Sequence, residues 1–302
     1  MPVSIRCRGL GFESSGSRSQ WIPGTGNPFP PRTFPIRNPI FARSESPGCR
    51  RVDFTDPHAL VTALEGFDAV VNLASSSVPS AVETGGLGAI EASARTLEYI
   101  IEASLTAKVT KIVYLSSGGT IYGRLQRPAR ESDPARPVNY YGITKALEES
   151  LLLRRHYLGE MRVSVLRVAN AYGPRQIGFR QQGLIGAAIA CSRSGVPLTL
   201  FGAGDQVRDF VYASDVVTAV AAALVRDDPF PVYNIGTGKG TSVRDLLGIV
   251  SSAFDSPLLI HYADERKVDL PYNVLDISKA LEVLHWAPQV DLYEGIEETL
   301  RA

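Results

Sequence analysis

The sequence lacks an excess of charge of either sign. Its 31 basic residues balance its 31 acidic residues over a length of 302. Proteins that bind nucleic acid or anionic membranes through charge usually carry a basic surplus, so the composition gives no electrostatic case for either partner. A chain of this length can bury one large core, or a main domain with a smaller lobe.

Cysteine, clustered histidine and long apolar runs are also scarce. The cysteines are odd in number and widely scattered, which indicates neither a disulfide framework nor a metal site (Cys7, Cys49 and Cys191). The four histidines fall outside every motif described below. The longest apolar run, residues 216–225 with one Thr, is far too short to span a bilayer. No apolar stretch follows the first ten residues, so no signal peptide is visible and we expect a cytoplasmic enzyme without a metal.

The most informative motif that is present is Tyr141-Gly-Ile-Thr-Lys145. It lies in a segment predicted to be helical over residues 140–156, with one apolar stripe formed by Ile143, Leu147 and Leu151. Residues four apart leave the same face of a helix, and an ammonium beside a phenol favours the phenolate. Such a pair can move a proton near neutral pH. The alternative is an amphipathic helix with an exposed Lys and a half-buried Tyr, since the isolated pattern is common.

From Val52 onward, short apolar runs alternate with helical patterns. We expect strands over residues 68–74, 111–116 and 162–168, and helices over 87–107, 140–156 and 181–194. This alternation is typical of an α/β fold with a doubly wound parallel sheet, in which ligands bind at the carboxyl ends of the strands. Ser116, Ser117 and Asn170 fall at such strand ends.

Further motifs stand in order around Tyr141. They are Tyr114-Leu-Ser-Ser-Gly-Gly-Thr-Ile-Tyr-Gly123, Leu166-Arg-Val-Ala-Asn-Ala-Tyr-Gly-Pro174, Phe201-Gly-Ala-Gly-Asp-Gln-Val-Arg-Asp-Phe-Val-Tyr212, Tyr233-Asn-Ile-Gly-Thr-Gly238 and Arg266-Lys-Val-Asp269. In this order and spacing they resemble the extended short-chain dehydrogenase/reductase family, and within it the nucleotide-sugar epimerases and dehydratases of the UDP-glucose 4-epimerase type. The resemblance implies a Rossmann-like domain over residues 52–302, with a small substrate lobe formed mainly by residues 171–212 and 255–302.

The resemblance also implies catalytic roles. Tyr141 resembles the base, and Lys145 the residue that favours its phenolate form and holds the nicotinamide ribose. The family places a Ser or Thr where this chain has Gly118, so the hydroxyl that contacts the sugar must come from Ser117 or Thr120. We favour Ser117, because it is adjacent and ends a strand. The alternative is that both hydroxyls only cap the turn.

Position 119 bears on the type of reaction. Sugar 4,6-dehydratases need an Asp-Glu pair after that hydroxyl, whereas this chain has Gly119-Thr120. Without an acid there, elimination lacks its general acid. The resemblance therefore favours epimerisation or simple keto-reduction over dehydration.

Binding residues follow from the same resemblance. Asn170, at a strand end, would hold the diphosphate-sugar. Arg208 and Arg266 would bind the diphosphate, and Asp269 would contact the ribose. The alternative for these three charged residues is that they form surface ion pairs. Arginine suits phosphate because its guanidinium presents a fixed fork of donors. The cofactor NAD would lie against Asp53, Phe54, Leu73, Ala74, Ser75 and Ser116.

Residues 1–51 do not fit this pattern. Their first 50 residues hold eight Pro, seven Arg, seven Ser and six Gly, and show no helical stripe. Aligned on the family's glycine turn for the pyrophosphate, they keep Gly11, but Arg8 and Ser14 replace the outer glycines. This first β-α-β unit is atypical or missing: either it is a variant, disordered arm, or residues 13–50 are translated in a shifted reading frame. We favour the second interpretation.

The sequence therefore predicts an NAD-dependent 4-epimerase of a nucleoside-diphosphate sugar, working through a 4-keto intermediate. One alternative is a reductase of a keto-sugar nucleotide. Another is an inactive sugar-nucleotide-binding protein, because the cofactor turn is damaged and Gly118 replaces a hydroxyl. By analogy with the family, a homodimer would form through the helices at residues 87–107 and 140–156.

Overall fold

The computed structural model describes residues 40–41, 49–50, 52–74, 79–176, 183–254 and 257–301. The expectations for Gly11 and Ser75 lie outside these residues. Near the start, two short strands pair in parallel, β1 (Ile40–Phe41) and β2 (Cys49–Arg50).

A parallel sheet of four strands forms the centre of the described fold, in the order β10-β5-β4-β3. Its strands are β3 (Ala69–Asn72), β4 (Lys111–Ser117), β5 (Arg162–Val168) and β10 (Val232–Ile235). The first three match the predicted strands to within a few residues. The predicted α/β class with a parallel sheet is therefore confirmed, whereas β10 was not predicted as a strand.

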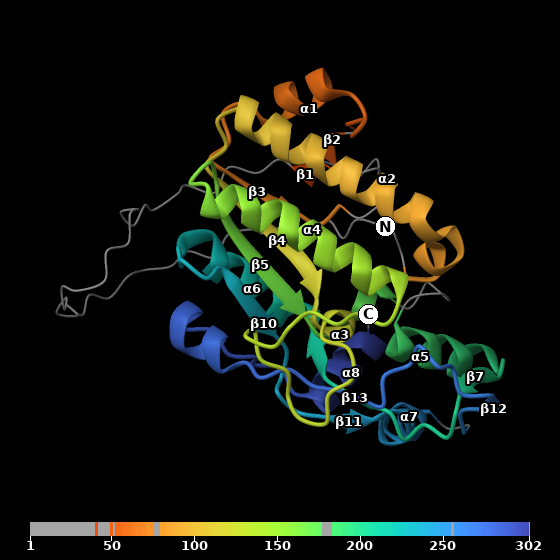
Figure 1. Cartoon of the computed structure of the whole chain (residues 1–302). Helices are drawn as coiled ribbons and strands as arrows, with labels where there is room; N and C mark the ends of the chain where they lie inside the picture. The colour runs from red at the N-terminus through yellow and green to blue at the C-terminus, as the bar shows by residue number, and fades with distance from the viewer. Residues whose placement is uncertain are drawn as a thin grey trace.

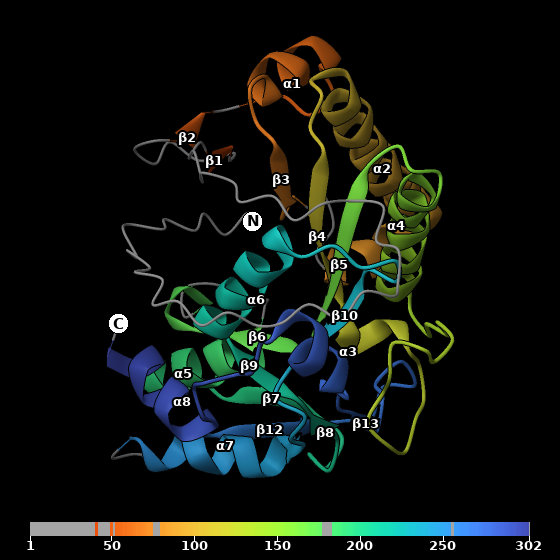
Figure 2. The ribbon, with the colours of Figure 1, turned by 90° about the vertical axis from the view of Figure 1, so that its left-hand side faces the viewer.

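Helices cover both faces of this sheet. Figures 1 and 2 show three of them along one face, α1 (Pro57–Leu64), α2 (Pro79–Thr106) and α4 (Tyr140–Tyr157), and α6 (Ala213–Val225) against the other. Successive side chains of a strand point to opposite faces. In β4, Ile112 and Tyr114 accordingly pack in the cluster with α2 and α4, while Val113 packs in the cluster with α6.

Most of the remaining elements lie beyond the carboxyl ends of the central strands (Figure 2), whereas the turn at Ala280–Leu284 packs beside β10 and α6. The helical ones are α3 (Gly118–Ile121), a 3₁₀ turn η1 (Pro174–Gln176), α5 (Leu184–Ser194), α7 (Val243–Ser252), a π-helical turn η2 (Ala280–Leu284) and α8 (Leu292–Arg301). The strands are β6 (Asn170–Tyr172), β7 (Leu198–Phe201), β8 (Val207–Arg208), β9 (Phe210–Tyr212), β11 (Thr241–Ser242), β12 (Ile260–Ala263) and β13 (Tyr272–Asn273).

These small strands form three further sheets, β11-β8-β13, β12-β7 and β6-β9. A second apolar cluster joins α5, α7 and α8 to β7 and β9, with Ile189, Leu200 and Leu246 among its buried members. Helix α7 lies outside the bounds that the sequence suggested for the substrate lobe, yet it packs against α5 in this cluster.

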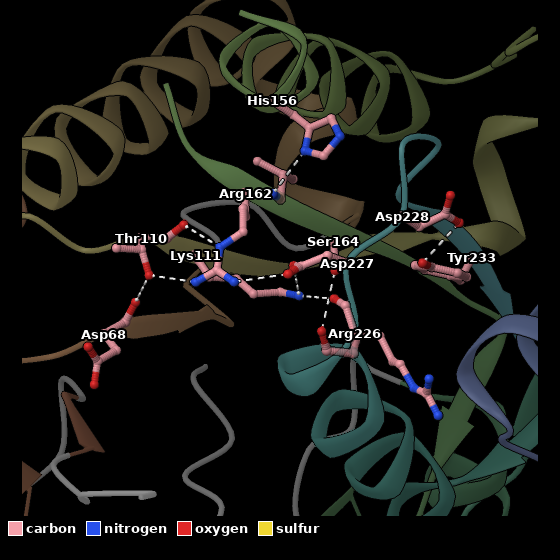
Figure 3. A network of polar contacts seen from close by, with 12 residues as sticks. Asp68, Thr110, Lys111, His156, Arg162, Ser164, Arg226, Asp227, Asp228 and Tyr233 are labelled. Carbon is pink, nitrogen blue, oxygen red and sulfur yellow. Dashed lines mark hydrogen bonds and ion pairs between the residues drawn. The ribbon is translucent and has the colours of Figure 1, made fainter. Parts of the chain in front are cut away.

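A buried polar network closes the amino ends of β4 and β5 (Figure 3). The carboxylate of Asp227, just after α6, accepts from Lys111 Nζ at 3.1 Å and from Arg162 Nη1 at 2.9 Å. Lys111 also donates to the carbonyl of Arg226, and Arg162 donates to Thr110 Oγ1 at 2.8 Å. Burial lowers the pKa of Lys111, and the charge of Asp227 opposes that shift. One carboxylate therefore holds two buried cations from adjacent strands.

Over the residues that the structure describes, no helix is long and apolar enough to cross a bilayer. The same residues contain no group of three or more His, Cys, Asp or Glu side chains placed to hold a metal ion.

Candidate active site

Helix α4 begins at Tyr140, as the sequence predicts, and packs against α3. Its N-cap Asn139 accepts a hydrogen bond from Gly142 N at 2.8 Å, which satisfies one of the free amide groups of the first turn. A Cβ atom at position 142 would lie 2.7 Å from Thr120 O and 2.8 Å from Pro137 Cβ. Only glycine permits this close approach, so the Tyr141-Gly142 pair brings Tyr141 beside the turn that carries Thr120.

Tyr141 and Lys145 occupy neighbouring turns of α4, as their spacing predicts. The Nζ atom of Lys145 lies 5.8 Å from the centroid of the Tyr141 ring. Tyr141 is half-buried, but Lys145 is only 3% exposed. The alternative interpretation, an exposed lysine on an ordinary amphipathic helix, is wrong because the amine points into the protein.

Two members of the apolar stripe predicted for α4 lie on its exposed side, whereas the third, Leu151, packs against the core. Ile143 is 41% exposed and Leu147 is 39% exposed. The buried face is instead mostly polar, formed by Gly142, Thr144, Lys145, Glu148, Glu149 and Leu152. Buried charges are tolerated where they are paired, and here Glu149 pairs with Arg167 of β5 at 2.7 Å.

The two candidate hydroxyls are not used as helix caps. Ser117 is the N-cap residue of α3, but its side chain makes no capping hydrogen bond. Thr120 Oγ1 is buried and has no hydrogen-bond partner within the described residues. The interpretation that both hydroxyls merely cap the turn is therefore wrong.

Polar oxygens from three elements converge around Gly119. A Cβ atom placed at Gly119 would lie 3.8 Å from Ser117 Oγ, 3.9 Å from Asn170 Oδ1 and 3.9 Å from Asn273 Oδ1. Asn273 Oδ1 is buried without a partner within the described part of the chain. These groups can accept or donate hydrogen bonds to hydroxyls of a ligand, and none of the three is an acid.

Gly118 lies too close to its neighbours for a larger residue. A Cβ atom there would lie 2.6 Å from Leu275 Cδ1 and 3.0 Å from Arg167 O. In this chain, Leu275 therefore fills the place where the resemblance would put a serine or threonine side chain. Of the neighbouring hydroxyls, that of Ser117 reaches the space beside Gly119.

Asn170 and Asn273 tie this site to the strands behind it. Asn170 Nδ2 donates to Asp209 O at 2.9 Å, which leaves its Oδ1 toward Gly119. Asn273 Nδ2 donates to Gly118 O at 3.2 Å, and Asn273 pairs with Arg208 in the β13-β8 ladder. Asn273 was not among the predicted site residues, although it lies only four residues beyond the Arg266–Asp269 motif.

Arg208, Arg266 and Asp269 line one cavity of about 570 Å³, which also has an apolar wall of α5 and β7 residues. Arg266 pairs with Asp269 through two contacts of 2.9 Å and stacks on Phe201, with its Cζ 4.1 Å from the ring centroid. Arg208 has no carboxylate within ion-pair distance among the described residues. Burial lowers the pKa of Arg208, against the opposing charge of Asp269. An arginine never loses its proton in proteins, so this cavity presents an unpaired positive charge.

The expected cofactor residues lie in two places. Leu73 and Ala74 follow β3, with Ala74 N donating to Asn72 Oδ1 at 2.9 Å. Ser116 is the second-last residue of β4, and its buried hydroxyl has no partner within the described residues. Asp53 instead accepts from Thr55 N at 2.9 Å in a local turn, and Phe54 packs on the cluster that holds Leu60 and Leu64. The first set could hold a cofactor at the carboxyl edge of the sheet.

Comparisons with known proteins agree with this arrangement. The UDP-glucose 4-epimerase of Mycolicibacterium smegmatis is 35% identical over 202 residues, which cover 67% of this chain and 64% of that protein. The dTDP-D-glucose 4,6-dehydratase of Bos taurus is 30% identical over 209 residues, which cover 67% of this chain and 58% of that protein. This chain thus spans just under two thirds of the length of the first of these relatives.

Solved structures and family profiles give the same result. The structure of the UDP-glucose 4-epimerase of Thermus thermophilus in complex with NAD superposes with a TM-score of 0.78 and 30% identity, covering 84% of this chain and 83% of that one. The profile of the NAD dependent epimerase/dehydratase family matches residues 36–236. That match covers most of the chain and begins upstream of Val52. The chain belongs to the NAD dependent epimerase/dehydratase family.

Proposed function

We propose that this protein is an NAD-dependent epimerase that inverts a hydroxyl-bearing carbon of a nucleoside-diphosphate sugar, as UDP-glucose 4-epimerases do. One observation carries the proposal. Asn273 joins the neutral polar groups around Gly119 to Arg208, its ladder partner, which lines the cationic cavity. A ligand with a polar sugar at one end and a diphosphate and base at the other matches this pair of adjoining sites.

The residues of the chain fit the nicotinamide end of NAD. The unpartnered hydroxyl of Ser116 and the backbone at Leu73 and Ala74 lie at the carboxyl edge of the sheet, where α/β folds bind dinucleotides. Lys145 lies beside Tyr141 and has hydrogen-bonding capacity for a ribose hydroxyl. NAD, when bound, supplies a hydride acceptor and donor at this edge.

The protein's own part in the reaction is proton transfer and positioning. Tyr141, as phenolate, takes the proton from the sugar 4-hydroxyl while a hydride leaves carbon C4. It returns the proton to the oxygen when a hydride is added to the opposite face of C4. Lys145 stabilises that phenolate by its positive charge. Ser117 and Asn170 hold the sugar oxygen through hydrogen bonds beside Gly119.

The neutral surroundings of Gly119 favour epimerisation over dehydration. Elimination of water from C5 and C6 needs a carboxylic acid to protonate the leaving hydroxyl. Ser117, Asn170 and Asn273 supply hydroxyl and amide groups at this position. The relationship to a 4,6-dehydratase thus reflects common family membership, and the described side chains nearest Gly119 supply no acid for elimination. A keto-sugar reductase remains the second candidate, and it is distinguished by a requirement for added NADPH.

The homodimer predicted from the family resemblance stays a prediction. The surface it would bury includes the exposed stripe of α4, with Ile143 and Leu147, and the adjoining helix α2 (Figure 1).

Substitution of the cavity arginines tests the proposed substrate class. Arg208→Ala and Arg266→Ala should each weaken UDP binding by about 1.5–3 kcal/mol, because each removes a charge-assisted contact to the diphosphate. Titration calorimetry with UDP measures the change. Arg244→Ala is the matched control, since Arg244 pairs with Asp205 on the exposed surface and does not line the cavity. Unchanged UDP affinity for both cavity variants would exclude the diphosphate role.

A further inference from the structure

Glu148 is a buried carboxylate that no part of the proposed reaction uses directly. It is 2% exposed, and it lies on α4 one turn after Lys145. Its Oε1 accepts a hydrogen bond from Ser93 Oγ of α2 at 2.7 Å, and its Oε2 accepts from the Tyr114 hydroxyl of β4. Three different elements therefore contribute to the surroundings of this one side chain.

Glu148 forms an ion pair with Lys145. Lys145 Nζ donates to Glu148 Oε2 at 3.0 Å and to the Tyr114 hydroxyl at 2.7 Å. Nζ also lies 4.9 Å from the centroid of the Tyr114 ring. An ammonium has three hydrogens. Two of them are taken by Glu148 and Tyr114, which leaves one for a ligand on the side of Tyr141.

Tyr114 is suited to be a fixed, neutral member of this group. Burial raises the pKa of Tyr114 well above its ordinary value, and the charge of Glu148 raises it further. The phenol therefore keeps its proton, donates it to Glu148 and accepts from Lys145 with the same oxygen. Lys145 thus donates a hydrogen bond to Tyr114, and Tyr114 donates one to Glu148.

The energetic reason for such an arrangement is the cost of burying an ammonium. An isolated charge in the interior is strongly disfavoured, and a carboxylate with further hydrogen bonds offsets that cost. Without Glu148, Lys145 would be a buried cation whose remaining partners are neutral. It would then be free to swing toward solvent.

We propose that Glu148, together with Tyr114, is the positioning residue of the Tyr141–Lys145 pair. It holds the Lys145 amine in place, with one hydrogen free beside the phenol of Tyr141. The inference rests on the proposed function for its catalytic meaning. Whether Glu148 holds Lys145 in place can be measured without assaying any enzymatic reaction.

Chemical acetylation of Lys145 provides that measurement. Acetic anhydride reacts with a free, unprotonated amine, and peptide mass spectrometry reports the rate at each lysine. Glu148→Gln keeps the side-chain shape and removes the charge, while Tyr114→Phe keeps the ring and removes the hydroxyl. Exposed Lys108 serves as the internal reference in every digest. The matched control is Glu149→Gln, one residue along the same helix, whose carboxylate pairs with Arg167 and not with Lys145.

Acetylation of Lys145 relative to Lys108 should rise about tenfold or more in Glu148→Gln, as the loss of a charged hydrogen bond implies, and by a smaller factor in Tyr114→Phe. Glu149→Gln should leave the ratio within about twofold, the size of an indirect effect. An unchanged ratio in Glu148→Gln overturns the proposal, and so does an equal rise in the control, which would mean general loosening of α4. If Glu148→Gln fails to fold, the ratio in Tyr114→Phe decides in the same way.

Kinetics then separate this inference from the proposed function. Glu148→Gln should lower kcat for epimerisation roughly 10-fold to 100-fold, because a misplaced group loses alignment with the reacting atoms, while KM for the sugar nucleotide stays within about twofold. Raised acetylation with no epimerase activity in any form of the protein supports the positioning of Lys145 and counts against the proposed function. Full activity of Glu148→Gln in an active protein overturns the positioning role.

Discussion

Tyr141→Phe should lower kcat for epimerisation by about 10²-fold or more, the usual contribution of a general acid or base. The substitution keeps the ring, which is half-buried beside Lys145, and removes only the oxygen that takes the proton. Because the sugar nucleotide is proposed to bind mainly through the cavity of Arg208, its KM should change little. Steady-state kinetics with a UDP-sugar, and product ratios from chromatography, measure both quantities.

Tyr140→Phe is the control for this experiment. Tyr140 is the neighbouring residue in α4 and is 40% exposed, so it tests the loss of a phenol at the same end of the helix outside the site. Its kcat should stay within about twofold of the unsubstituted protein, as is usual for a surface change away from the reacting groups. Near-normal epimerisation by Tyr141→Phe would refute the assignment of Tyr141 as the base.

Asp227→Asn should lower the free energy of unfolding by about 3–5 kcal/mol, because it leaves buried cations without their carboxylate. Asp227 is the shared partner of Lys111 and Arg162 at the amino ends of β4 and β5 (Figure 3). Denaturation in urea, followed by circular dichroism, gives the difference. The network lies at the opposite end of the strands from Ser117 and Asn170, so UDP binding at low temperature should be preserved.

The control for Asp227 is an ion pair on the surface. Asp205→Asn removes the partner of Arg244, and both of these side chains are well exposed. Exposed ion pairs contribute about 0–1 kcal/mol, so Asp205→Asn should lower the free energy of unfolding only slightly. If the two substitutions cost the same, the network of Asp227 does not hold the strand ends together.

The frame of the fold was predictable from local patterns in the sequence. Continuous apolar runs identified β4 and β5, and the strand-helix alternation identified a parallel sheet, since both depend on residues close together in the chain. The start of α2 was not predicted. Helix α2 begins at Pro79, before a kink at Gly86 with φ of 54°, a conformation that favours glycine and reads in the sequence as a break.

The candidate site was only partly predictable. Tyr141 and Lys145 were found from their spacing, because one helix places both. Glu148 was missed, since a glutamate in a helix is normally exposed, and its partners Tyr114 and Ser93 lie 34 and 55 residues away. Such contacts arise only when α2, β4 and α4 are packed together. The same packing turns the polar face of α4 inward and leaves Ile143 on the outside.

The most direct test of the account is to follow the protein with NAD and UDP-glucose by proton NMR of the sugar's anomeric signal. The account predicts that the signal of UDP-galactose appears and approaches a fixed ratio, without net accumulation of reduced cofactor and without added NADPH, and that Tyr141→Phe slows its appearance by about 10²-fold or more. Accumulation of a 4-keto-6-deoxy sugar would contradict the account, because it would require an acid that the described side chains nearest Gly119 do not supply. Absence of any sugar product from a folded protein that binds both NAD and UDP-glucose would contradict it as well.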